Sequence, residues 1–156
     1  MATTTTDLYR SVMGDAFKKV KIKTGQYPGD GILDPRWTST SYVRKRDGKT
    51  MVSRADVTVV MGTNGPEVQT GGGTSLHDVP GWFPCKEFWL PEGTEYSNEI
   101  YIRKDDKLKA SPSNPSLQGY HYQLEPRTQM TVDAFKGYLN NMARAAVVRQ
   151  CELARN

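Results

Sequence analysis

The C-terminal part of this sequence carries a helical pattern that the rest of the chain does not repeat. From Val132 onward, apolar residues recur at helical spacing, at Phe135, Leu139, Met142, Ala146 and Leu153. Thr131 has the side chain of an N-cap, and Arg149 and Arg155 lie where the helix dipole favours positive charge. The pattern predicts one long amphipathic helix with one apolar face to bury.

The segments before this helix have the alternating or β-branched runs that are typical of short strands. Strands are predicted at residues 8–13, 55–61, 87–90, 99–103 and 119–124. Pro91-Glu92-Gly93-Thr94 predicts a tight turn, residues 110–116 a surface loop, and Pro126 the end of the last strand. Short strands followed by one closing helix indicate an α+β fold.

Residues 14–50 are rich in Gly, Lys, Pro, Ser and Thr. We interpret them as long loops around a site, with at most a short helix near Ala16 to Lys21. The whole chain has 156 residues, a usual size for one domain, so a single domain over residues 1–156 is expected.

Several classes of protein are disfavoured by composition. Apolar runs such as 57–61 are far too short for a membrane span, and the first residues lack the pattern of a secretory signal peptide. Any export would therefore need a specialised secretion system. Cys85 and Cys151 cannot form a disulfide framework, and free thiols suit a reducing compartment, so we expect action in a cytoplasm. His77 and His121 have no paired Cys or His spacing, and no metal is expected.

Charge is unevenly distributed along the chain. Residues 10–54 contain eleven Lys or Arg against four Asp, whereas residues 67–99 contain six acidic residues and one Lys. A basic half of this kind attracts a dinucleotide, a nucleic acid or an acidic protein; the alternative is a merely solvated surface.

The run Gly71-Gly72-Gly73-Thr74-Ser75 is a candidate site. Consecutive glycines permit positive φ angles and close approach to a ligand, and the adjacent hydroxyls supply hydrogen bonds. The run lacks the Lys of a phosphate loop and the spacing of a Rossmann turn. By itself it fits a plain flexible turn better than a site, since glycine clusters mark turns more often than sites.

A second candidate lies on the strand at 119–124. Strand alternation places His121, Gln123 and Glu125 on one face, and Tyr120, Tyr122 and Leu124 on the other. The first face is either a row of catalytic groups or an exposed polar surface. His77 is interpreted as a surface turn residue.

Two arginines complete the candidates. Arg10 shares a strand face with Leu8 and Val12, and a guanidinium in such a place usually holds a carboxylate or a ligand phosphate. Arg54, just before the strand at 55–61, has the same two interpretations, a ligand contact or a structural salt bridge.

Five short motifs resemble, in order, one known family. They are Leu8-Tyr9-Arg10, Gly72-Gly73-Thr74-Ser75, Leu90 to Thr94, His121-Tyr122 with Pro126 and Met130, and Tyr138-Leu139-Asn140-Asn141 with Arg149-Gln150. The set is similar to the second exported effector of the type VI secretion system, a family of cytotoxins with a fold like that of ADP-ribosyltransferases. Residues 14–53 do not contribute to the resemblance.

The resemblance implies an ADP-ribosyltransferase-like core, in which two small, mostly antiparallel sheets form a cleft beside a long C-terminal helix. It implies NAD as a substrate, and catalytic roles for Thr74, Ser75 and His121. NAD binding would fall to Arg10, Arg54, Gly73 and Tyr122. Glu125, in Gln123-Leu124-Glu125, matches the catalytic glutamate pattern of many ADP-ribosyltransferases.

The function implied is a cytotoxin that transfers ADP-ribose to a protein or nucleic acid, or hydrolyses NAD, and that a small acidic immunity protein holds inactive. Two alternatives remain open. A metal-independent ribonuclease would use His121 as acid or base and the basic region to hold RNA. A non-enzymatic module would use the same basic surface to bind an acidic partner.

Overall fold

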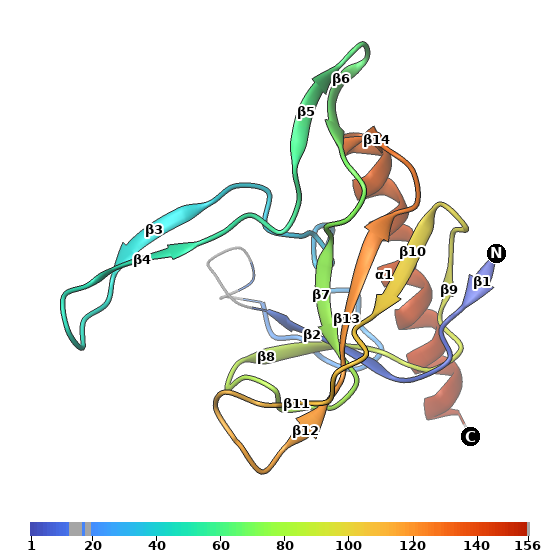
Figure 1. Ribbon diagram of the computed structural model, residues 1–156. Helices are drawn as coiled ribbons and strands as arrows, with labels where there is room; N and C mark the ends of the chain where they lie inside the picture. The colour runs from blue at the N-terminus through green and yellow to red at the C-terminus, as the bar shows by residue number, and fades with distance from the viewer. Residues whose placement is uncertain (13–16, 18–19, 156) are drawn as a thin grey trace.

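The computed structural model describes residues 1–12, 17 and 20–155 (Figure 1). Its elements, in chain order, are β1 (Ala2–Thr3), β2 (Leu8–Val12), β3 (Thr40–Val43), β4 (Thr50–Ser53), β5 (Val59–Gly62), β6 (Gly65–Val68), β7 (Thr74–His77), β8 (Lys86–Leu90), β9 (Glu95–Tyr96), β10 (Ile100–Lys104), β11 (Lys109–Ala110), β12 (Gln118–Gly119), β13 (His121–Pro126), β14 (Met130–Thr131) and α1 (Val132–Ala154). The α+β expectation is confirmed.

The largest sheet has the strand order β10-β13-β7-β2-β8, and every described pairing is antiparallel. A three-stranded sheet β14-β6-β5 and the pairs β1-β9, β11-β12 and β3-β4 accompany it among the described residues. The small antiparallel sheets expected from the resemblance are therefore present.

Helix α1 lies against the large sheet and closes the core. Its buried face includes Phe135, Leu139, Met142 and Ala146, as predicted, and these side chains join one cluster with residues of the sheet such as Leu76. The Thr131 hydroxyl accepts a hydrogen bond from the Ala134 N–H at 3.1 Å, which confirms the predicted N-cap.

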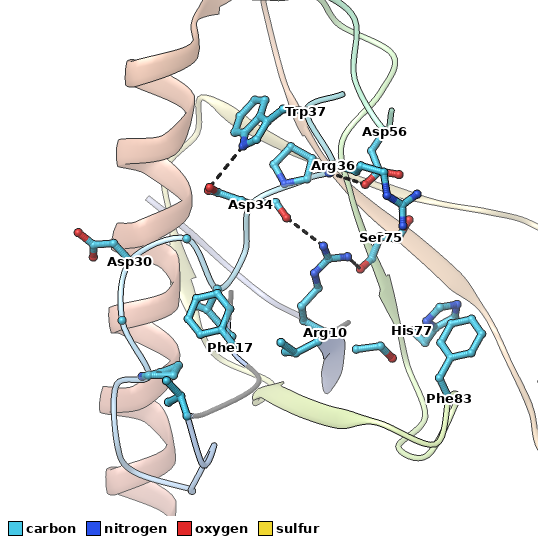
Figure 2. A pocket seen from close by; sticks show the side chains of 18 of the residues that line it. Arg10, Phe17, Asp30, Asp34, Arg36, Trp37, Asp56, Ser75, His77 and Phe83 are labelled. Carbon is cyan, nitrogen blue, oxygen red and sulfur yellow. Dashed lines mark hydrogen bonds between the residues drawn. The ribbon is translucent and has the colours of Figure 1, made fainter. Parts of the chain in front are cut away.

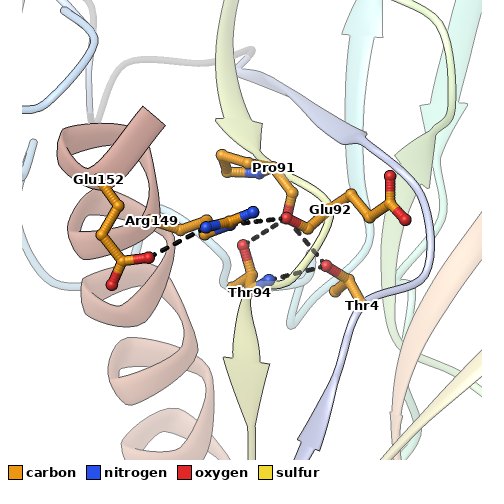
Figure 3. A network of polar contacts seen from close by, with 6 residues as sticks. All are labelled: Thr4, Pro91, Glu92, Thr94, Arg149 and Glu152. Carbon is orange, nitrogen blue, oxygen red and sulfur yellow. Dashed lines mark hydrogen bonds and ion pairs between the residues drawn. The ribbon is translucent and has the colours of Figure 1, made fainter. Parts of the chain in front are cut away.

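The C-terminal part of α1 is tied to the turn after β8 (Figure 3). Arg149 donates to the carbonyl of Glu92 at 3.0 Å and to the Glu152 carboxylate at 3.1 Å. Within the predicted turn, the Thr94 N–H donates to the Pro91 carbonyl at 3.1 Å, and the Thr4 hydroxyl donates to the same oxygen at 2.9 Å. The N-terminal segment, the turn and the helix are thereby joined.

Two expectations about the region before Gly62 are wrong. Residues 40–53 form the hairpin β3–β4 and not a loop, and the strand predicted at 55–61 begins only at Val59. Asp56 bonds to Arg36, through its own N–H at 2.8 Å and its carboxylate at 2.6 Å, and the neighbouring Val57 is buried. These contacts with the loop around Arg36 take the place of strand pairing at Asp56. The short helix expected near 16–21 lies largely outside the described residues.

The other strand predictions are confirmed with shifts at the ends, except that 119–124 divides between β12 and β13. Met13, the last residue of the strand predicted at 8–13, lies outside the described residues. Pro126 is the last residue of β13, as expected. The 110–116 loop is not wholly on the surface, because Ser111 is buried and donates to the Trp82 carbonyl at 2.5 Å. None of the described helical residues form a helix with the length and apolar character to span a membrane.

Candidate functional site

A cavity of about 870 Å³ opens beside the large sheet (Figure 2). Its wall is formed by β2, by Ser75 and His77 of β7, by His121 of β13, by the loop at 28–37, and by Phe17, Val20, Asp56 and Phe83. Its volume lies within the range of small-molecule sites, roughly 300–1,000 Å³. The described part of the loop between β2 and β3 thus completes a pocket beside the sheet, in keeping with the prediction of loops around a site in residues 14–50.

Arg10 crosses the floor of this pocket, and Figure 2 shows its guanidinium between Asp34 and Ser75. It donates to the Ser75 carbonyl at 3.0 Å and to the Asp34 carbonyl at 2.9 Å. Both acceptors are uncharged, and among the described residues no carboxylate forms an ion pair with Arg10. Burial lowers the pKa of Arg10, with Asp56 the largest opposing influence, but a guanidinium stays protonated. The pocket therefore contains a cation that has no ion-pair partner in the described part of the chain.

The same pocket contains an acceptor without a donor. Oδ1 of Asp34 is buried and has no hydrogen-bond partner in the described part of the chain, while its Oδ2 accepts from the Trp37 indole at 3.4 Å. Buried polar atoms are nearly always paired in folded proteins, so an unpaired one in a pocket indicates a place for a ligand donor. Arg10 and Asp34 together suit a ligand that has both an anionic group and hydroxyl or amide groups.

Thr74 fixes the loop that holds Arg10. Its side chain is fully buried, and its hydroxyl donates to the Leu33 carbonyl at 2.5 Å. The Gly31 N–H also donates to the Asn140 side chain at 2.9 Å, which ties the loop to α1. Thr74 does not line the pocket, so its hydroxyl acts on the position of the Asp34 carbonyl and not directly on a ligand.

Ser75, His77 and His121 lie together on the pocket wall. His77 is directly opposite His121 in the β7–β13 register, with ring centroids 5.3 Å apart, and Ser75 is opposite Gln123. The His77 ring stacks on Trp82 at 4.4 Å. The interpretation of His77 as a surface turn residue is wrong, because β7 continues through it and buries it.

Both imidazoles are held neutral. Burial, and then the charge of His121, lowers the pKa of His77 to about 4. Burial, and then the charge of Lys109, lowers the pKa of His121, against an opposing influence of Asp105 and Asp56. At neutral pH each ring therefore offers one donor and one acceptor nitrogen to a ligand.

Acidification is expected to destabilise the protein between pH 6.5 and pH 4. Unfolded His77 titrates near its ordinary value of 6.5 and folded His77 near 4, so in this interval the unfolded state binds a proton that the folded state does not. The free energy of unfolding should fall by about 2 kcal/mol, after allowance for partial solvent screening. Urea unfolding as a function of pH measures this, and His77→Gln should reduce the slope. An equally steep slope in His77→Gln would contradict the assignment.

Besides Thr74, four of the predicted site residues lie outside the pocket lining: Gly73, Arg54, Glu125 and Tyr122. An added Cβ on Gly73 would lie 1.9 Å from the Leu124 carbonyl oxygen, so β13 occupies the space at this glycine. Among the three consecutive glycines only Gly71 has a positive φ, of +96°. Arg54 is exposed, and its backbone carbonyl accepts from Arg36 at 3.0 Å.

Glu125 and Tyr122, both on β13, have their contacts outside the pocket. The Glu125 side chain is almost fully buried and forms a bidentate ion pair with Arg103, at 2.6 and 3.2 Å. The exposed polar face considered for this strand is therefore wrong at Glu125. Tyr122 is half-buried against the core, with the Lys104 ammonium 6.0 Å from its ring centre.

Sequence reasoning missed His77, Asp34, Arg36 and Asp56 as parts of the pocket. A signal for His77 was present, because strand alternation puts it on the same face as Ser75. Nothing local marks Asp34, whose role depends on contact with Arg10. Among the described residues no cluster of three or more His, Cys, Asp or Glu is arranged to hold a metal ion.

The fold and the pocket define a small α+β protein with a cleft lined by Arg10, His77 and His121. A model of the Tse2 ADP-ribosyltransferase toxin family matches residues 6–151, and the chain belongs to this family. It is also similar to Toxin Tse2 of Pseudomonas aeruginosa, with 34% identity over 99 residues, which cover 62% of this chain and 59% of that protein. The family resemblance drawn from the five motifs is thereby confirmed.

Proposed function

We propose that this protein is an NAD-dependent mono-ADP-ribosyltransferase, or NAD glycohydrolase, that acts as a toxin through one domain spanning residues 1–156. Membership of the Tse2 family supports the class of reaction. The observation that carries the proposal is Arg10, a half-buried cation whose hydrogen bonds to described residues all go to neutral carbonyls, in a cavity large enough for a dinucleotide. A phosphate of NAD would supply the missing negative charge through charge-assisted hydrogen bonds.

The other groups of the pocket suit the rest of NAD. Asp34 Oδ1 would accept from a ribose hydroxyl or the nicotinamide amide, since no described residue donates to it. The Ser75 hydroxyl and the neutral His121 imidazole would hydrogen-bond the nicotinamide ribose. Ser75 and His121 lie on neighbouring strands of one sheet, which favours precise positioning of the ribose.

The reaction breaks the bond between ribose C1′ and the nicotinamide nitrogen. The bonding electron pair leaves with nicotinamide, positive charge develops on the ribose, and an acceptor nucleophile or water then bonds to C1′ and loses a proton. The protein's task is to hold this geometry and to stabilise the developing charge with fixed dipoles. We propose that Arg10, Ser75 and His121 contact NAD, and that Thr74 and Gly73 act by positioning them. Roles for Arg54, Tyr122 and Glu125 remain predictions of the resemblance.

Replacing Ser75 or His121 by alanine is expected to reduce nicotinamide release by roughly 100-fold, the usual effect of removing one positioned donor. Chromatographic measurement of nicotinamide from purified protein and NAD tests this. The thermal midpoint should stay within about 3 °C of wild type, since neither side chain belongs to the core cluster. Ser116→Ala is the matched control, because Ser116 is exposed and outside the pocket. Full turnover in both pocket variants would refute these roles.

A ribonuclease is the second candidate, because the pair His77 and His121 could act as base and acid on an RNA phosphate. The two functions differ in what they consume. The ribonuclease would cleave RNA without NAD and would release no nicotinamide. A non-enzymatic module would retain its toxicity in Ser75→Ala, whereas an enzyme would lose it.

The setting of this activity follows from the resemblance alone. We propose that the toxin reaches the cytoplasm of a target cell through a specialised secretion system, and that its producer carries a small acidic immunity protein. Toxicity on cytoplasmic expression, relieved by a co-expressed immunity protein, would support this setting.

A further inference from the structure

The hairpin β3–β4 extends away from the rest of the molecule as an arm, here defined as residues 40–53 (Figure 1). Its strands pair only with each other among the described residues, so both outer edges offer unpaired backbone groups. All of β3 is exposed. A free two-stranded ribbon of this kind gains little stability from its own contacts.

Both faces of the arm carry apolar side chains. The register pairs Tyr42 with Met51 on one face, and it places Val43 and Val52 on the other. Tyr42, Val43 and Val52 are 53%, 64% and 62% exposed. Apolar side chains on both faces of a projecting ribbon, beside open strand edges, are typical of a surface that binds another protein.

The tip of the arm is strongly basic. Arg44, Lys45, Arg46 and Lys49 accompany a single acidic residue, Asp47, which forms an ion pair with Arg44. The excess positive charge calls for an acidic partner surface. Charge alone would also suit a nucleic acid. The four apolar side chains of the strands, here called the stem of the arm (Tyr42, Val43, Met51 and Val52), would however find no apolar surface to contact on a phosphate backbone. The combination favours an acidic protein.

The base of the arm adjoins the pocket. The Arg36 guanidinium donates to the Arg54 carbonyl at 3.0 Å, and the Ala55 N–H donates to the Ser39 hydroxyl at 3.1 Å. Arg36 and Asp56, on either side of this base, both line the pocket. A protein bound along the arm would therefore lie near the pocket mouth.

We propose that the arm docks the acceptor of the ADP-ribosyl group, and that this acceptor is a protein with an acidic surface beside an apolar groove. The inference rests on the proposed NAD-dependent transfer. It separates two tasks within the molecule: the pocket cleaves NAD, and the arm brings the acceptor to it.

The test uses the full chain with NAD labelled in its adenylate part, added to cell extract. Two variants alter the arm, Lys45→Glu with Arg46→Glu at the tip and Val43→Thr with Val52→Thr on the stem. Each is expected to lower acid-insoluble label at least about 10-fold, which corresponds to about 1.4 kcal/mol of binding. Nicotinamide release to water without extract should stay within about twofold of wild type, since no arm residue lines the pocket. Arg127→Glu with Arg155→Glu, exposed and outside both arm and pocket, is the control for charge reversal.

The label should be removed by protease and resist nuclease, and labelling should fall with added salt more steeply than hydrolysis does. Unchanged labelling by both arm variants would overturn the proposal, and so would label that nuclease removes. Failure of the proposed function has a different signature, since wild-type protein would then release no nicotinamide with or without extract.

Discussion

Replacing Arg10 by glutamine is expected to lower nicotinamide release by about 1,000-fold. The phosphate of bound NAD would then lack its cationic partner, a loss of about 4 kcal/mol in transition-state stabilisation. Glutamine keeps a hydrogen-bond donor but removes the charge that no described carboxylate pairs with. Turnover of NAD by purified protein measures the effect. NAD should also raise the thermal midpoint of the wild type but not of Arg10→Gln, because only a binding-competent folded state is stabilised by a ligand.

Two further substitutions of Arg10 distinguish a role in ligand binding from a structural role. Arg10→Met removes an uncompensated charge from a half-buried place, so the thermal midpoint without NAD should change by less than about 4 °C. Arg10→Lys keeps the charge but loses the planar fork that reaches both the Ser75 and Asp34 carbonyls, and an intermediate turnover is expected. Unfolding of Arg10→Met together with full turnover in Arg10→Lys would contradict a role in binding a phosphate.

Replacing Gly73 by alanine is expected to lower the free energy of unfolding by about 4 kcal/mol or more, at the upper end of single-residue effects. The added Cβ would lie 1.9 Å from the Leu124 carbonyl oxygen and 2.6 Å from its carbon. These are backbone atoms of β13, and they cannot move aside without disturbing the pairing of Leu124 with Thr74. Urea unfolding followed by circular dichroism measures the loss.

Gly137→Ala is the matched control for this substitution. Gly137 lies within α1, and an added Cβ there meets no atom within 4 Å. Alanine should stabilise the helix by about 0.5–1 kcal/mol. If Gly73→Ala were as stable as wild type and had lost only NAD turnover, Gly73 would make room for the ligand, as the resemblance implied, and the packing explanation would fail.

The helix was predictable because its signals are local. Apolar spacing and the Thr131 cap are properties of neighbouring residues, and the burial of one face follows from them. The arm gave no such signal. Neither face of β3–β4 is covered, so apolar and polar residues do not alternate along Tyr42-Val43 or Met51-Val52. The remaining local clue was Asp47-Gly48, a dipeptide typical of hairpin turns.

The candidate site was predictable only in part, for a related reason. Arg10 and Ser75 are recognisable from strand alternation and hydroxyl chemistry, and both line the pocket. Thr74 has the same chemistry as Ser75 but faces the opposite side of β7, where it bonds Leu33. The Asp34 carbonyl meets Arg10 across 24 residues of chain, a contact that only the folded loop creates. Residue type thus indicates the chemistry available, while tertiary contacts decide which residues reach the pocket.

The most direct measurement is release of nicotinamide from NAD by the purified wild-type protein in the presence of cell extract. Nicotinamide should accumulate in step with the loss of NAD, and Arg10→Gln should lower its release about 1,000-fold. Cleavage of RNA without NAD, with no nicotinamide formed, would contradict the proposed function.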